Sequence, residues 1–288
     1  MNPFSENNSG LREAERFCSA MARREAKNFY WGFISLPYDQ RIAIYALYDF
    51  ARQIDDEADA AGPEGLADRL MGQRARLERA LLGEYSDPVM RVLGPAVERY
   101  SIPHIELHQL IDGVAMDVDT SRYQTWEELQ HYCRLVASVV GRMCVRIFGF
   151  QNPIALQHTD ELGVALQLIN ILRDVREDAQ MGRIYLPQED LNRFGIAERD
   201  LLASTPGSAW QSLVAFEVAR ARTLWQRGQR VLEYIPTRPG VCVATMGGIY
   251  RRILEQIASD PELPLRGRAS LSGREKLAVV IQAWLQTR

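Results

Sequence analysis

One stretch of the sequence, residues 166–178 with the letters LQLINILRDVRED, limits the fold more than any other. An α-helix turns about 100° per residue, so Gln167, Asn170, Asp174 and Asp178 share an arc of roughly 80°. Leucine and isoleucine cover almost every other direction, and a helix that is apolar nearly all round is usually buried. The stretch therefore predicts a central helix that carries two carboxylates and two amides into the interior.

Carboxylates in an interior are costly unless a cation or a metal ion compensates them. An ion pair with a neighbouring helix is one interpretation of each aspartate. A second stripe favours another, because Tyr48, Arg52, Asp55 and Asp59 stand at spacings of four, three and four and share roughly 60° of arc. Four carboxylates outnumber the one arginine in the stripes, and hard oxygen ligands suit a divalent ion such as Mg²⁺.

The composition is that of a soluble globular protein, because 47% of the 288 residues are hydrophobic and 25% are charged. A net charge of −3 argues against nucleic acid as the main partner. The four cysteines lack metal-ligand spacing, which indicates buried thiols in a reducing compartment. Residues 1–10 are polar, lack the pattern of a signal peptide and are expected to be flexible. No run has the roughly 18 uncharged apolar residues that cross a bilayer, so we expect a cytoplasmic protein with at most peripheral membrane contact.

Proline and glycine divide the chain into helical segments, and no segment alternates as a strand does. No linker, repeat or low-complexity tract interrupts them, so we expect residues 1–288 to form one all-α domain. The predicted helices lie at residues 11–27, 38–60, 66–82, 88–100, 103–117, 125–148, 153–178, 188–204, 209–234, 240–258 and 270–286.

The helix at 38–60 has an apolar flank that Asp55 and Asp59 border. Asp56 and Glu57 lie on the other flank, and we interpret both as solvated surface charges. Arg52 has two interpretations: a helix-stabilising ion pair, which is favoured when the residue is taken alone, or a donor to an anion such as phosphate.

Three arginines accompany the central helix. Arg176 points away from the stripe of Asp174 and is expected to face solvent, whereas Arg173 points sideways. Arg183 follows the helix in the segment GRIYLP, where it either returns a cation toward the carboxylates or simply complements the helix C-terminus.

Two aspartate pairs at i, i+4 spacing on facing helices imply Mg²⁺ ions that hold a polyphosphate. Metal ions, Arg and Lys neutralise a departing diphosphate, and an allylic diphosphate then leaves a carbocation that needs a dry, aromatic-lined cavity. The core is the simpler interpretation of any one aromatic residue. The candidates for the cavity lining are Phe29, Tyr30, Trp31, Tyr45, Tyr48 and Tyr132.

Residues 52–59 (RQIDDEAD) and 166–178 resemble the two aspartate-rich signatures of the squalene/phytoene synthase family. The likeness extends over most of the chain. It includes residues 28–30, 36–37, 132–141, 182–187 and 248–250. The resemblance implies an all-α isoprenoid-synthase helical bundle with a central cavity. It also implies a prenyltransferase, an alkyl transferase that joins two prenyl diphosphates head to head.

The resemblance also implies roles for individual residues. Mg²⁺, or Mn²⁺ in its place, would be bound by Asp55, Asp59, Asn170, Asp174 and Asp178, with Asp117 as a weaker candidate. The catalytic set implied is the four stripe aspartates with Tyr48 and Arg52. The substrate-binding set implied is Lys27, Phe29, Tyr132, Val136, Gly141, Gln167, Asn170, Arg173, Arg183 and Tyr250.

Residues 24–30 and 270–276 are most similar to the presqualene diphosphate synthases of hopanoid pathways. Ala26 and Asn28 stand where many relatives carry serines, which puts one phosphate contact in doubt. We expect two farnesyl diphosphates to be coupled to presqualene diphosphate. The alternatives are a phytoene synthase that uses two geranylgeranyl diphosphates, a full squalene synthase that needs NADPH, and a catalytically silent scaffold. Other pathway enzymes are the expected protein partners.

Overall fold

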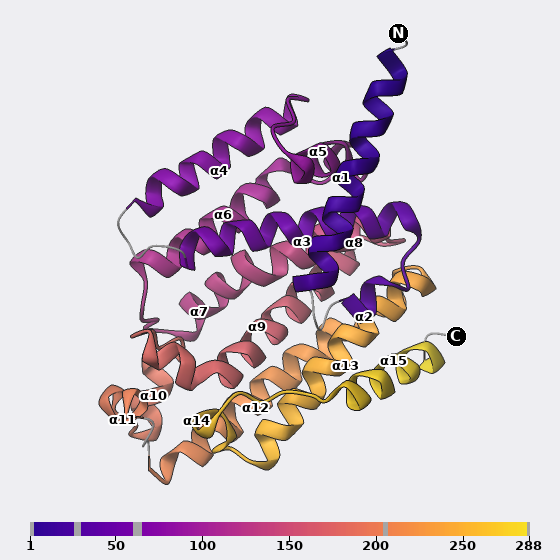
Figure 1. Ribbon diagram of the computed structural model, residues 1–288. Coiled ribbons are helices and arrows are strands. Elements are labelled where there is room, and N and C mark those ends of the chain that lie inside the picture. Colours follow the sequence, from indigo (N-terminus) through magenta and orange to yellow (C-terminus); the bar gives the residue numbers. More distant parts are fainter. Residues whose placement is uncertain (1–2, 26–29, 60–64, 204–206, 287–288) are drawn as a thin grey trace.

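The computed structural model describes residues 3–25, 30–59, 65–203 and 207–286 (Figure 1). Helices fill most of these ranges, and the one strand-like feature within them is a single bridge between Arg122 and Ile184. The prediction of an all-α protein is therefore confirmed. The elements are α1 (Pro3–Glu25), α2 (Tyr30–Phe33), α3 (Tyr38–Asp59), α4 (Leu66–Leu81), α5 (Pro88–Arg99), α6 (His104–Asp119), α7 (Trp126–Cys133), η1 (Arg134–Ser138), α8 (Val139–Phe148), α9 (Ile154–Gln180), α10 (Gln188–Phe194), α11 (Glu198–Leu202), α12 (Ala209–Gly228), η2 (Gln229–Glu233), α13 (Thr237–Ser259), α14 (Leu263–Arg266) and α15 (Gly273–Gln286).

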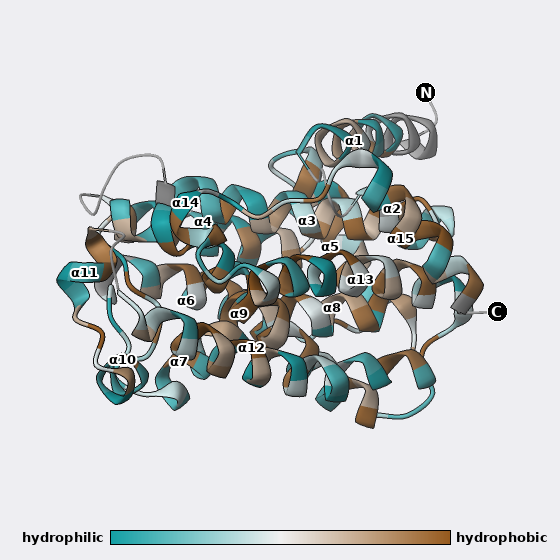
Figure 2. Ribbon diagram, turned by 90° about the horizontal axis from the view of Figure 1, so that it is seen from below, coloured by the Kyte–Doolittle hydropathy of each residue, from teal (hydrophilic) through white to brown (hydrophobic). Residues whose placement is uncertain are grey.

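Helix α9 is the central helix that the sequence predicts. It packs against α8, η1, α12 and α13, and Leu168, Ile169 and Leu172 are at most 1% exposed. Two glycines allow the close approach: a Cβ on Gly163 would lie 2.5 Å from Ser138 Cα, and one on Gly228 would lie 2.4 Å from Leu162 N. The middle of the molecule around α9 is largely hydrophobic, whereas α10 and α11 at its edge are hydrophilic (Figure 2).

Helix α3 lies on the other side of the bundle from α12 and α13 (Figure 1). It packs on α1, α5 and α6, and α8 contacts both α3 and α9. Helix α8 thus connects the two aspartate-bearing helices.

Some predicted helix boundaries are wrong. The predicted helix at 125–148 is interrupted by a π-helical turn, η1, and the segment at 188–204 forms two short helices, α10 and α11. Helix α1 begins at Pro3, before the expected start at Leu11. A π-turn inserts one residue into an otherwise regular helix, so apolar periodicity barely registers it.

Within the described part of the chain, no helix is long and apolar enough to cross a membrane.

Candidate active site

The polar stripe of α9 contains a buried oxygen without a hydrogen-bond partner. The Nδ2 group of Asn170 donates to Gln167 Oε1 at 3.3 Å, but the buried Oδ1 of Asn170 accepts no hydrogen bond. Leaving such an acceptor unsatisfied costs about 1–3 kcal/mol. An oxygen held in this way, one turn from Asp174, is suited to coordinate a cation.

Two arginines form ion pairs with Asp174. Arg173 Nε donates to Asp174 Oδ1 at 2.8 Å, and Arg268 Nε lies 3.0 Å from the same oxygen. Arg173 is buried and also hydrogen-bonds with Tyr250, which is 5% exposed. Arg173, Arg176 and Arg268 line one hollow beside this carboxylate. Arg268 was not predicted as a site residue, because its contact with Asp174 spans 94 residues and only a short basic loop indicates it in the sequence.

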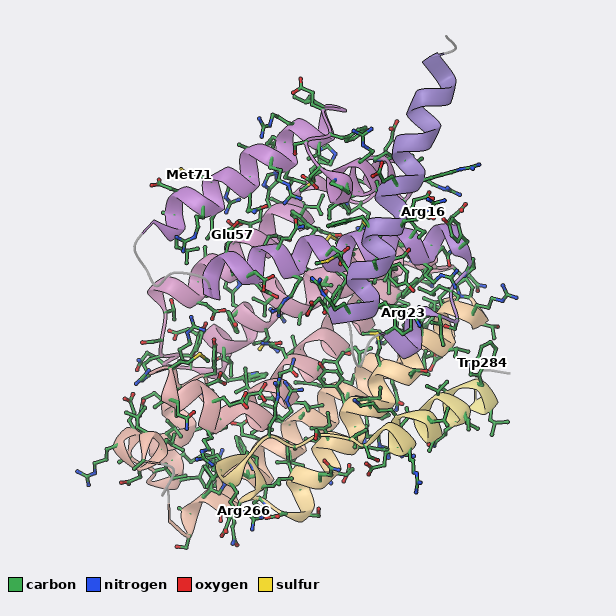
Figure 3. All side chains as sticks on the ribbon, viewed as in Figure 1. Arg16, Arg23, Glu57, Met71, Arg266 and Trp284 are labelled. Carbon is green, nitrogen blue, oxygen red and sulfur yellow. The ribbon has the colours of Figure 1, made fainter. Side chains whose placement is uncertain are left out.

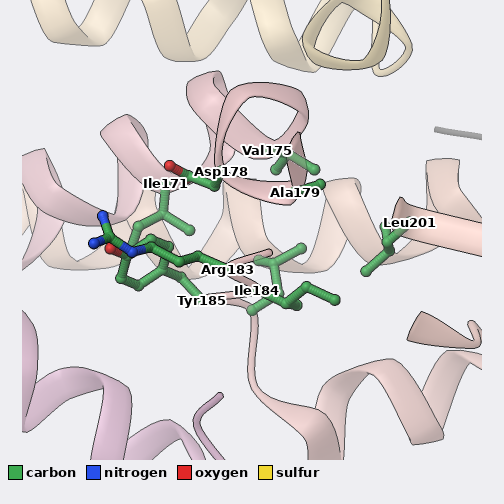
Figure 4. A pocket seen from close by; sticks show the side chains of 9 residues that line it. Ile171, Val175, Asp178, Ala179, Arg183, Ile184, Tyr185 and Leu201 are labelled. Carbon is green, nitrogen blue, oxygen red and sulfur yellow. The ribbon is translucent and has the colours of Figure 1, made fainter. Parts of the chain in front are cut away.

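Asp178, one turn further, is in a different electrostatic environment. Burial and the nearby charge of Asp174 raise the pKa of the Asp178 carboxyl to about 7, and Arg183 opposes this shift. Asp178, Arg183 and Tyr185 line a narrow pocket with the apolar side chains of α9 and Leu201 (Figure 4). An isolated carboxylate here is disfavoured, and a cation would relieve the penalty.

The segment that follows α9 turns back on itself. Gly182 adopts a positive φ of 75°, which a glycine tolerates without strain, and Arg183 N donates to Asp178 O at 2.9 Å. Ile184 N then donates to Ser121 O at 3.0 Å, which fixes the segment against the end of α6. Of the two interpretations of Arg183, the return toward the carboxylates is favoured, because its charge opposes the burial that raises the pKa of the Asp178 carboxyl.

Asp117 joins two phenols. Its carboxylate accepts hydrogen bonds from Tyr132 at 2.9 Å and from Tyr185 at 2.8 Å. The rings of these tyrosines are 5.3 Å apart, and Tyr123 packs against both. Burial raises the pKa of Tyr132 well above its usual value, so the phenol keeps its proton. Tyr123 and Tyr185 were not predicted as site residues, since a single aromatic residue in a loop gives no periodic signal.

The stripe of α3 is more exposed. Arg52 pairs with Asp56 at 2.8 Å, and the two side chains are 46% and 56% exposed. The ion-pair interpretation of Arg52 is therefore confirmed, with Asp56 as a partner. Tyr48 is half-buried, packs edge-to-face on Phe33 at 6.3 Å, and burial raises the pKa of its phenol to about 12.

Glu57 is not the solvated charge that we predicted. It is half-buried and contacts Arg69 at 3.4 Å and Gln73 at 3.2 Å, both on α4. Helical facing places a residue on a flank but does not say whether another helix covers that flank.

The other predicted residues divide into three groups. Val136 lies in η1 against Gly113, where an added Cβ would be 2.9 Å from Val136 Cγ1. Gly141 packs on Thr159 of α9, and Tyr45 is a core residue that stacks on Tyr30 at 6.5 Å. Lys27, Phe29 and the side chains of Trp31 and Asp59 lie outside the described residues.

A divalent cation fits the α9 stripe. No three described His, Cys, Asp or Glu side chains converge on one point by themselves. The donor set is instead mixed: the orphaned oxygen of Asn170 and the carboxylates of Asp174 and Asp178, all hard oxygen ligands. A diphosphate would supply further oxygens.

A sequence profile of the squalene/phytoene synthase family matches residues 22–275, which is most of the chain. The chain belongs to the squalene/phytoene synthase family. Members of this family are prenyltransferases that act on prenyl diphosphates and condense them head to head. The predicted family, fold and enzyme class are therefore confirmed for this synthase.

Named relatives include a phytoene synthase of Mycobacterium tuberculosis, 37% identical over 277 residues that cover 95% of this chain and 91% of the relative. A 15-cis-phytoene synthase of Synechocystis is 34% identical to this chain, and the alignment covers 100% of this chain and 89% of the relative. Among solved structures, the squalene synthase HpnC of Alicyclobacillus acidocaldarius has a TM-score of 0.82 at 30% identity. The superposition covers 86% of this chain and 94% of HpnC. A dehydrosqualene synthase bound to a ligand has a TM-score of 0.88 at 27% identity and full coverage of both chains.

Proposed function

We propose that this synthase couples two farnesyl diphosphates to presqualene diphosphate in a reaction that depends on Mg²⁺. The observation that carries the proposal is the orphaned oxygen of Asn170 beside Asp174 and Asp178, which suits a metal-bound diphosphate. The preference for fifteen-carbon substrates is supported by the two solved structures described above. Both are named for products related to squalene, a thirty-carbon compound.

The carboxylates of α9 and α3 would hold the metal: Asp174, Asp178 and Asn170 on one side, Asp55 and Asp59 on the other. Bound Mg²⁺ would neutralise the charge of the leaving diphosphate. Arg173 and Arg268 flank Asp174, and Arg183 lies near Asp178, so these three guanidinium groups are positioned to bind phosphate oxygens.

The proposed condensation consists of ionisation, attack and loss of a proton. One prenyl diphosphate ionises to diphosphate and an allylic cation, and the double bond of the second substrate attacks the cation. A proton then passes to the released diphosphate as the cyclopropane ring closes, and the second diphosphate is retained. The rings of Tyr132 and Tyr185, which lie 5.3 Å apart, and of Tyr250, which contacts Arg173, would stabilise positive charge and exclude water.

Phytoene formation from two geranylgeranyl diphosphates is the second candidate. The names of the relatives at 37% and 34% identity favour it. A squalene synthase would add a reductive opening of the cyclopropane by NADPH. A silent scaffold is disfavoured because both aspartate signatures are intact.

A product assay tests the proposal. The purified protein is given Mg²⁺ with farnesyl or geranylgeranyl diphosphate, with and without NADPH, and the products are identified by mass spectrometry. Presqualene diphosphate from the farnesyl substrate, unchanged by NADPH, is the expected result. Phytoene from the longer substrate, or squalene that appears only with NADPH, would replace it with the corresponding alternative.

A further inference from the structure

Helix α15 covers α13 with one face and leaves an apolar face uncovered. Val279 and Ala283 are 3% and 2% exposed and form the inner face. The contact is tight, since a Cβ on Gly248 of α13 would lie 2.7 Å from Val279 Cγ1. The helix is therefore a fixed part of the bundle, and its outer face is held in one orientation.

The outer face carries large hydrophobic side chains that are unusually exposed. Leu277, Ile281 and Leu285 are 50%, 53% and 70% exposed, and Trp284 beside them is 38% exposed. These four residues share about 100° of arc on one helix. Isolated exposed apolar residues are ordinary, but a contiguous stripe of them marks an interaction surface.

Other exposed apolar residues occur in elements at the same end of the molecule. Ile34 in the turn after α2 is 43% exposed. Both α2 and α15 pack on α13, and Figures 1 and 2 show α2 and α15 at the same end of the molecule, where Figure 3 labels Trp284. We name the surface formed by Leu277, Ile281, Trp284 and Leu285 the α15 face.

The charge around this face differs in sign from that of the chain. The described residues 273–286 contain two basic residues, Arg274 and Lys276, and one acidic residue, a net charge of +1, whereas the whole chain carries −3. The single acid, Glu275, is engaged by Ser272, whose N and Oγ both donate to it at 2.7 Å. Arg274, one turn before Leu277 on the same helix, is exposed. The surface is thus apolar with a basic border.

We propose that the α15 face docks on an anionic lipid surface. An amphipathic helix with leucine, isoleucine and tryptophan on one side and basic residues beside them lies in the plane of a membrane interface. Tryptophan prefers the headgroup level of a bilayer, and basic side chains attract anionic lipids. A second copy of the chain is a poorer occupant, because a symmetric contact would bring the two basic borders together.

The benefit that lipid docking would bring to catalysis rests on the proposed function. Prenyl diphosphates and their larger product are amphiphiles that partition into bilayers, so a docked synthase takes up substrate and releases product at the same surface. The docking itself depends only on the α15 face and is measured without substrate.

Vesicle flotation tests the proposal. The full chain is mixed with vesicles of phosphatidylcholine alone, or of phosphatidylcholine with phosphatidylglycerol, in low and in high salt. Wild type is expected to float with the anionic vesicles in low salt and much less in the other conditions. The double variant I281E/L285E is expected to lose about 10-fold or more in vesicle partition, since two exposed apolar side chains that would enter the lipid surface become charged.

The matched control is M71E/L82E, which places two glutamates at residues 58% and 79% exposed, Met71 on α4 and Leu82 directly after it; Figure 3 shows Met71 far from Trp284. It is expected to float like wild type, and both variants are expected to keep the melting temperature of wild type. Quenching of fluorescence by brominated lipid should be reduced in Trp284→Phe. A wild type that does not float, or two double variants that float equally, overturns the proposal.

Two further outcomes are decisive. A dimer seen by light scattering without vesicles, and dissociated by I281E/L285E, would assign the α15 face to a second copy and overturn lipid docking. Flotation together with no product from any prenyl diphosphate would uphold docking and overturn the proposed function, so the two failures are distinguishable.

Discussion

Helices α3 and α9 carry the same aspartate spacing in opposite surroundings. On α9, Asp174 is 16% exposed and lies between Arg173 and Arg268. On α3, Arg52 is about half exposed and turns to Asp56. The difference arises because α9 is enclosed by several helices, whereas the last turns of α3 reach the surface. Spacing identifies residues that share a face, and the neighbouring helices decide how strongly their charges interact.

The largest effect is expected at the enclosed stripe. Asp174→Asn should lower kcat/KM for farnesyl diphosphate about 1,000-fold, because it removes a metal ligand and leaves two guanidinium groups unbalanced. Steady-state kinetics in Mg²⁺ measure this. Glu177→Gln on the same helix, 51% exposed, is the control and should stay within about 2-fold of wild type. A loss below about 10-fold for Asp174→Asn would show that α9 is not the centre of the site.

Substitutions on α3 should lower kcat/KM less than those on α9, and the loss should depend on which face of α3 carries the substituted aspartate. Asp55→Asn is expected to lower kcat/KM about 100-fold, whereas Asp56→Asn only breaks an exposed ion pair and should change it less than about 2-fold. The same kinetic assay compares the two. If they prove equally damaging, the assignment of faces on α3 is wrong.

The arginines provide a third comparison. Arg173→Ala should raise KM about 10-fold or more, since it removes a buried guanidinium beside Asp174. Arg176 is exposed and donates to Arg266 O at 2.7 Å, so Arg176→Ala should be mild. Arg183→Ala should resemble Arg173→Ala. Equal effects at positions 173 and 176 would remove the phosphate role of Arg173.

The smallest effect on turnover is expected at Asp49, the buried carboxylate of α3, which lies outside the stripe. Asp49 is 2% exposed, its Oδ2 lacks a partner, and burial raises the pKa of its carboxyl from 3.8 to about 7. The folded state therefore keeps a proton that the unfolded chain loses near pH 4. The free energy of unfolding should fall as the pH rises from about 4 to about 7 and then level off.

Asp49→Asn should remove this part of the pH dependence and melt at a higher temperature than wild type at pH 8, with kcat unchanged. Melting curves across the pH range measure it. If wild type instead becomes more stable relative to Asp49→Asn as the pH rises, the burial argument is contradicted.

The sequence predicts those features that local periodicity controls. The all-helical chain and the central position of α9 follow from helical facing and from glycine and proline positions. Contacts made over long separations do not follow. Arg268 reaches Asp174 from the segment after α14, and Tyr185 reaches Asp117 across 68 residues. Arg52 has acidic residues at both i+3 and i+4, and the sequence alone does not show that it pairs with Asp56.

The most direct measurement is the melting temperature of wild type, Asp55→Asn and Asp174→Asn with Mg²⁺, with inorganic diphosphate, and with both. A ligand that binds the native state raises the melting temperature. If α3 and α9 hold one metal-diphosphate together, wild type will show the full rise only with both ligands, and either substitution will abolish it. A rise that survives Asp55→Asn unchanged would mean that α9 binds alone and would contradict the shared site.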